Sequence, residues 1–80
     1  MESTIDDYEG SFEVKKLYDL CLKMAKSGRS DNTGMWYYTA AFLADLNGDV
    51  SNASYLIGLA ENSKRTDFID ESIKVFRMYI

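Results

Sequence analysis

The stretch from residue 35 to residue 44, Met-Trp-Tyr-Tyr-Thr-Ala-Ala-Phe-Leu-Ala, is apolar or aromatic on nearly every side of a helix. A helix that is hydrophobic all round has to be covered by other elements on more than one side. The chain contains no proline that could break it, and Asn47-Gly48 follows, where glycine readily takes the left-handed conformation that ends a helix. The sequence therefore predicts a helix over about 34–46, at the centre of an all-α fold.

A helix is also expected before this one, over about 12–27, with Ser11 as its cap and Gly28 as its stop signal. A polar acidic arm precedes it over residues 1–10, so a single helical domain is expected over 11–80. The residues expected to form its apolar stripe are Phe12, Leu17, Leu20, Leu22 and Met24, with Val14, Tyr18, Cys21 and Ala25 alongside.

Two more helices are expected after the central one, which makes four short helices in all. The third begins at Asp49 or Ser51 and reaches about Ser63, and the fourth begins at Thr66 or Asp67 with acids in its first turn. The fourth helix stays apolar up to the last residue of the sequence. Either it packs over its whole length, or the chain continues, or another subunit covers this end, as a homodimer through the C-terminal helix would.

Small residues recur along the helices expected over 34–46 and 49–63. The pattern of small residues and the larger residues beside them consists of Tyr37, Ala40, Ala41 and Ala44, then Gly48 at the turn, then Ala53, Ile57 and Ala60. Small side chains let two antiparallel helices touch, and this pattern over residues 34–65 resembles a tetratricopeptide repeat (TPR). Gly58 costs about 1 kcal/mol of helix propensity, which is easier to accept if it lets a neighbouring helix approach closely.

The rest of the chain fits the repeat less well. Tyr18, Leu22 and Ala25 precede the small residues of the third helix by thirty-five positions, near the period of the family, so the first helix could be half of an earlier repeat. Arg65 stands near the place where the family often has proline, and Ala44 replaces its usual large aromatic residue. The alternative to the TPR-like hairpin is an unrelated four-helix bundle.

The reactive groups that enzymes use are scarce in this sequence. There is no histidine, no phosphate-binding glycine loop, and a single cysteine, Cys21, in an apolar helical stretch that indicates a buried thiol. Residues 45–51 alternate oxygen-bearing side chains like a calcium loop, but Val50 and Leu56 occupy the places of its glycine and its acid. We therefore expect no enzyme activity, no metal and no cofactor.

The net charge of -4 and the pI of about 4.6 disfavour nucleic-acid binding, which depends on cationic side chains. The basic stretch over residues 13–30 is short and diluted by acids, which is typical of a solvated helix face. No run approaches the roughly 18 apolar residues that span a membrane. A complete chain of this kind would be cytoplasmic.

The expected function is a protein–protein interaction module, because the resemblance to TPR proteins implies a scaffold or adaptor that binds a protein or peptide. The candidate partner-binding residues are four aromatic side chains: Trp36, Tyr37, Tyr38 and Tyr55. The alternative is a small acidic inhibitor or regulator of a host protein, of phage or mobile-element origin, with the acidic arm or the acidic surface as a decoy.

Overall fold

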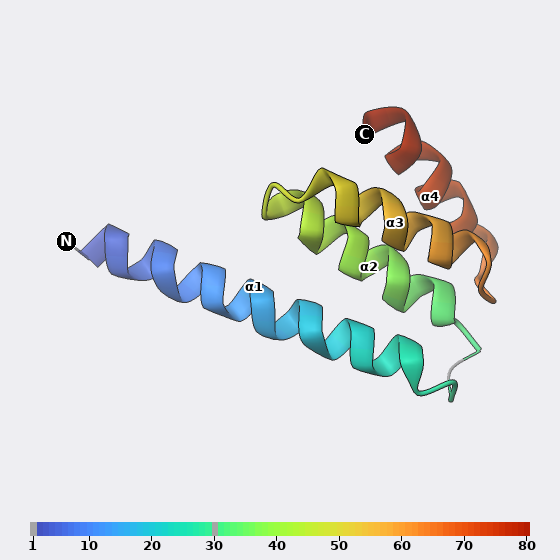
Figure 1. The fold of residues 1–80 in the computed structure, drawn as a ribbon, viewed down its shortest axis with the longest axis horizontal. Coiled ribbons are helices and arrows are strands. Elements are labelled where there is room, and N and C mark those ends of the chain that lie inside the picture. The colour runs from blue at the N-terminus through green and yellow to red at the C-terminus, as the bar shows by residue number, and fades with distance from the viewer. Residues whose placement is uncertain (1, 30) are drawn as a thin grey trace.

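The computed structural model describes residues 2–29 and 31–80, with the side chains of residues 14–29 and 31–80. The described residues form helices and turns without a strand, which confirms the all-α prediction (Figure 1). The helices are α1 (Glu2–Lys26), α2 (Thr33–Leu46), α3 (Val50–Glu61) and α4 (Asp67–Tyr79).

The first three helices lie side by side and alternate in direction, and α4 folds back against α2 and α3 (Figure 1). Helix α2 contacts each of the other three, which confirms its predicted central place. The N-terminal half of α1 extends beyond the end of α2 (Figure 1). Three neighbours thus account for much of the apolar surface of α2, although Phe42 and Leu46 stay 45% and 61% exposed.

The predicted start of the first helix is wrong. Helix α1 begins at Glu2 instead of after Ser11, so the backbone of residues 2–10 is helical and Gly10 lies inside the helix. A single glycine lowers helix propensity by only about 1 kcal/mol and does not force an end, as proline would. The acidic side chains of the arm over residues 1–10, one of the two surfaces that the decoy hypothesis names, lie outside the described side chains.

The stripe of α1 that faces the core also differs from the predicted one. Leu17 and Leu20 are 46% and 49% exposed, whereas Cys21 is buried as predicted, and burial raises the pKa of its thiol. The α1 residues packed in or against the core are Val14, Tyr18, Cys21, Leu22 and Ala25. The spacing of four, three and four residues from 14 to 25 keeps this second stripe on one side of the helix, against α2.

Helices α2 and α3 pack closely because the side chains between them are small. Ala40, Ala41, Ala53 and Ala60 have no exposed surface, and neither does Ile57. The turn that joins the two helices is short, because α2 ends at Leu46 and α3 begins at Val50.

The turn between α2 and α3 has the predicted chemistry. Gly48 has a φ of +83°, in the left-handed region, and its amide donates to the carbonyl oxygen of Asp45. The Asp49 carboxylate caps α3 by accepting from the backbone amide of Asn52. The amide of the Asn52 side chain donates to the Tyr18 hydroxyl at 2.6 Å, which ties α3 to α1.

The glycine that permits a close approach is Gly34, not Gly58. A Cβ added to Gly34 would lie 2.8 Å from the Cβ of Arg65 and 3.1 Å from the carbonyl oxygens of Ala60 and Lys64. The Gly34 amide also donates to the Lys64 carbonyl at 2.8 Å, so the start of α2 is fixed to the turn between α3 and α4. A Cβ on Gly58 would meet nothing within 4 Å, so the expectation for that residue is wrong.

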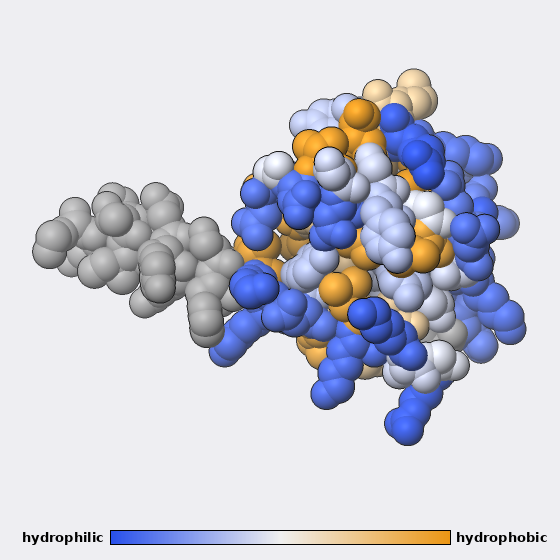
Figure 2. All heavy atoms as spheres, viewed as in Figure 1, coloured by the Kyte–Doolittle hydropathy of each residue, from blue (hydrophilic) through white to orange (hydrophobic). Residues whose placement is uncertain are grey.

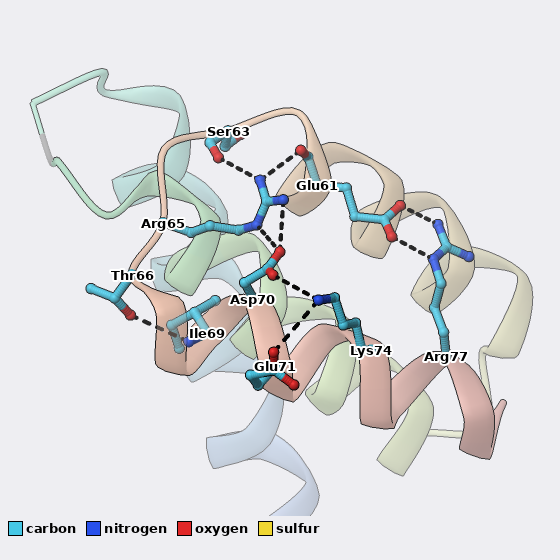
Figure 3. Close-up of polar contacts among 9 residues, drawn as sticks. All are labelled: Glu61, Ser63, Arg65, Thr66, Ile69, Asp70, Glu71, Lys74 and Arg77. Carbon is cyan, nitrogen blue, oxygen red and sulfur yellow. Dashed lines mark hydrogen bonds and ion pairs between the residues drawn. The ribbon is translucent and has the colours of Figure 1, made fainter.

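Arg65 holds the turn between α3 and α4 (Figure 3). Its guanidinium donates to the Glu61 carbonyl oxygen at 2.7 Å, in the last turn of α3 where carbonyls lack helical partners, and to the Ser63 carbonyl oxygen in the turn at 3.0 Å. The same group donates through Nε to the Asp70 carboxylate at 2.9 Å, and Lys74 binds the other oxygen of that carboxylate at 3.3 Å. Arg65 therefore fixes the direction in which α4 leaves the turn.

A second ion pair joins α3 to α4 farther along. The guanidinium of Arg77 on α4 donates through two nitrogens to the two carboxylate oxygens of Glu61 on α3 (Figure 3). The hydrogen bonds from Arg77 lower the pKa of Glu61, and those from Arg65 and Lys74 lower the pKa of Asp70. Both carboxylates thus bind protons less readily in the folded chain than in the unfolded one.

Acid is therefore expected to weaken the fold through these two groups. The stability that they contribute is present above their ordinary pKa values of 4.5 and 3.8, and it is lost as the pH falls through their lowered values. We expect the melting temperature to fall when the pH is lowered from 7 to about 3. The fall should be smaller in the variant Glu61→Gln/Asp70→Asn, which lacks both carboxylates. The control Asp31→Asn should keep the fall of the wild type, and an equal fall in all three proteins would contradict the prediction.

Candidate functional site

An open apolar groove of about 520 Å³ runs between α2 and α4. Pockets of this size hold ligands or partner side chains in many proteins. The residues that line it are Tyr38, Phe42, Asp45, Leu46, Phe68, Glu71, Ser72, Val75, Phe76 and Tyr79.

The periodicity of the two helices puts these residues in two facing rows. On α2, Tyr38, Phe42 and Leu46 follow one another at intervals of four residues and share one side of the helix. On α4, the row from Phe68 to Tyr79 lies beside a second row that enters the core, formed by Ile69, Ile73 and Phe76. Helix α4 thus has more apolar surface than its contact with α2 and α3 covers.

Phe76 forms the buried part of the groove. Its side chain is only 6% exposed. The Tyr38 ring meets it edge to face, with centroids 6.0 Å apart and planes at 79°, and the Phe42 ring lies 6.3 Å away at a tilt. These ring arrangements are favourable for aromatic pairs and fix one wall of the groove against its floor.

The upper parts of both walls are open to solvent. Phe42 is 45% exposed on α2, and Phe68 and Tyr79 are 77% and 79% exposed on α4. Apolar residues reach the surface near the end of α4, at the top of the view (Figure 2). Hydrophilic residues cover much of the rest of this face. Clustered exposed apolar side chains of this kind mark interaction surfaces more often than scattered ones do.

The sequence left open that the fourth helix packs over its whole length, and the exposure of its last turn excludes this. Met78 and Tyr79, in its last turn, are 87% and 79% exposed. The alternatives in which further chain or another subunit covers this end stay open.

The charged residues of the groove are acids. Asp45 on α2 and Glu71 on α4 line it, one from each wall, and no lysine or arginine is among the lining residues. Among the described residues Asp45 makes no ion pair, and Glu71 has only an exposed contact of 3.5 Å with Lys74. The groove is therefore apolar with anionic groups that are open to a new partner.

The structure separates the four aromatic residues that the sequence suggested for binding. Tyr38 lines the groove. Trp36 and Tyr37 are partly buried and pack against the core, and Tyr55 is 65% exposed on α3, away from the groove lining. Only one of the four therefore belongs to this site.

The residues that sequence reasoning missed are mainly those of α4, Phe68, Val75 and Tyr79. Their signal was present, because the apolar residues of this helix form two adjacent rows where one is enough for a core. A second apolar row shows that some apolar residues of the helix stay outside the core, but the sequence does not show which row that is.

No metal site or membrane span was found in the described part of the chain. Its acidic and thiol groups form no cluster that could hold a metal ion. None of its helices combines the length and the apolar character that crossing a bilayer requires. A scan against protein-family models and searches of curated proteins and of solved structures found no match for the chain.

Proposed function

We propose that this chain is a non-catalytic protein–protein interaction module that binds its partner in the groove between α2 and α4. The observation that carries this proposal is the exposed aromatic surface of the groove, above all Phe68 and Tyr79. Aromatic side chains around a hollow supply most of the binding energy in many interfaces. Leaving them in water without a partner has no benefit for the fold.

We further propose that α2 and α3 form a TPR-like hairpin. Support comes from the small residues of the repeat pattern, since Ala40, Ala41 and Ala53 are fully buried. In this interpretation α4 opens a following repeat, and the groove lies between two successive units. Arg65 takes over the task of the usual proline by ending α3 through its hydrogen bonds to backbone carbonyls.

A selection experiment tests the proposed function. A display library of random peptides is selected on the wild-type protein after removal of peptides that bind the variant Phe68→Ser/Val75→Ser. Both side chains are exposed, so the variant should fold normally while losing two large contacts of the groove. Enriched peptides are expected to bind the wild type at least about tenfold more tightly than this variant in fluorescence anisotropy.

The control removes exposed apolar surface from another place. Leu17→Ser/Leu20→Ser changes two half-exposed leucines on α1, and peptides selected on the wild type should bind it normally. If the peptides bind both variants as well as the wild type, or lose affinity for both equally, the groove is not the binding surface.

A further inference from the structure

We propose that the occupant of the groove is a cationic amphipathic helix of another protein, with its apolar side on the aromatic walls and its lysines or arginines toward Asp45 and Glu71. The inference rests on the proposed function and adds the chemistry of the partner. It follows from the charges and the shape of the groove.

Charge determines the first property of the partner. The two carboxylates belong to opposite walls, and no lysine or arginine is among the described lining residues, although Lys74 lies 3.5 Å from Glu71. A basic side chain between or beside them would gain from both, whereas an acidic one would be repelled by both. The net charge of -4 adds a weaker attraction for cations over longer distances.

The shape of the groove determines the second property. Its walls are the sides of two helices, with large side chains at intervals of three to four residues on each. A third helix laid between them can place its own side chains at matching intervals, as helix-in-groove complexes do. A volume of about 520 Å³ holds a few large apolar anchors of such a helix.

A second copy of the chain fits the groove less well. In a two-fold symmetric contact the same patch of both copies meets, so the acids of both grooves would lie within one interface without a lining lysine or arginine from either copy. Like charges brought together in this way disfavour association. A homodimer through α4 would appear in the test below as a dimer of the wild type that Phe68→Ser dissociates.

The test uses two fluorescein-labelled peptides of about 20 residues, because isolated helices much shorter than this are marginal in water. They have identical leucine positions, and their polar positions are all lysine in one and all glutamate in the other. We expect the lysine peptide to bind more tightly than the glutamate peptide in fluorescence anisotropy. The variant Phe68→Ser should weaken binding of the lysine peptide at least about tenfold, and Asp45→Asn/Glu71→Gln should weaken it about 3- to 10-fold.

The matched control separates the groove acids from net charge. Asp19→Asn/Asp31→Asn changes the net charge by the same amount at two exposed positions outside the groove, and it should change the affinity less than about twofold. Equal weakening by both double variants would overturn the assignment of Asp45 and Glu71.

The remaining outcomes distinguish this inference from the proposed function. If both peptides bind equally and both respond to Phe68→Ser, the groove is a binding surface but the cationic partner is wrong. If neither peptide responds to Phe68→Ser, the inference fails whatever the display selection gives. If the wild type sediments as a dimer that Phe68→Ser dissociates, the occupant is a second copy and the inference is overturned.

Discussion

Replacing Ala53 with leucine is expected to lower the melting temperature by about 10–20 °C. Ala53 has no exposed surface and lies on α3 in the core that α2 and α3 share. The larger side chain has to push the helices apart or take a strained rotamer, which costs about 2–3 kcal/mol. For a domain of this size each kcal/mol corresponds to about 4–8 °C in thermal unfolding followed by circular dichroism.

Ser54→Leu is the matched control for this change. It adds a leucine at the neighbouring position of the same helix, where the side chain is exposed, and it should alter the stability by no more than about 0.5 kcal/mol. An unchanged melting temperature for Ala53→Leu would show that α3 does not approach its neighbours closely. The TPR-like hairpin would then lose its support.

Replacing Gly34 with alanine is expected to destabilise the protein by about 1–2 kcal/mol, or roughly 5–10 °C. The new Cβ would lie 2.8 Å from the Cβ of Arg65, and 3.1 Å from two backbone carbonyl oxygens. None of these atoms is the far end of a flexible side chain, so the turn between α3 and α4 has to move. Since this turn sets the start of α4, peptide binding in the groove should weaken as well.

Gly58→Ala should have the opposite sign. Position 58 lies inside α3, and a Cβ there would meet no atom within 4 Å. Alanine then adds helix propensity without a clash and should stabilise the protein by about 0.5–1 kcal/mol. Destabilisation by both alanines, or by neither, would contradict the packing at these two glycines.

The candidate site was predictable only in part. The sequence indicated that aromatic residues of the central helix reach beyond the core, and Tyr38 does line the groove. Trp36 and Tyr37 were equally good candidates, and like Tyr38 they pack partly buried against the core, but they do not line the groove. Helical periodicity gives the angle between two side chains, and it does not give the direction of the neighbouring helix that covers one of them.

Local chemistry in the sequence predicted the helices from α2 onward and the central place of α2, and it reduced the caps of α3 and α4 to two candidates each. Thr66 and Asp49 cap their helices and Gly48 closes α2, because each of these tasks depends on a few adjacent residues. Only the tertiary structure decided which of two adjacent apolar rows is buried. On α1 it leaves Leu17 and Leu20 exposed, and on α4 it leaves one row to form the groove. The physical reason is that burial depends on where the axis of the next helix lies, which is set by contacts between residues far apart in the chain, such as Gly34 with Arg65.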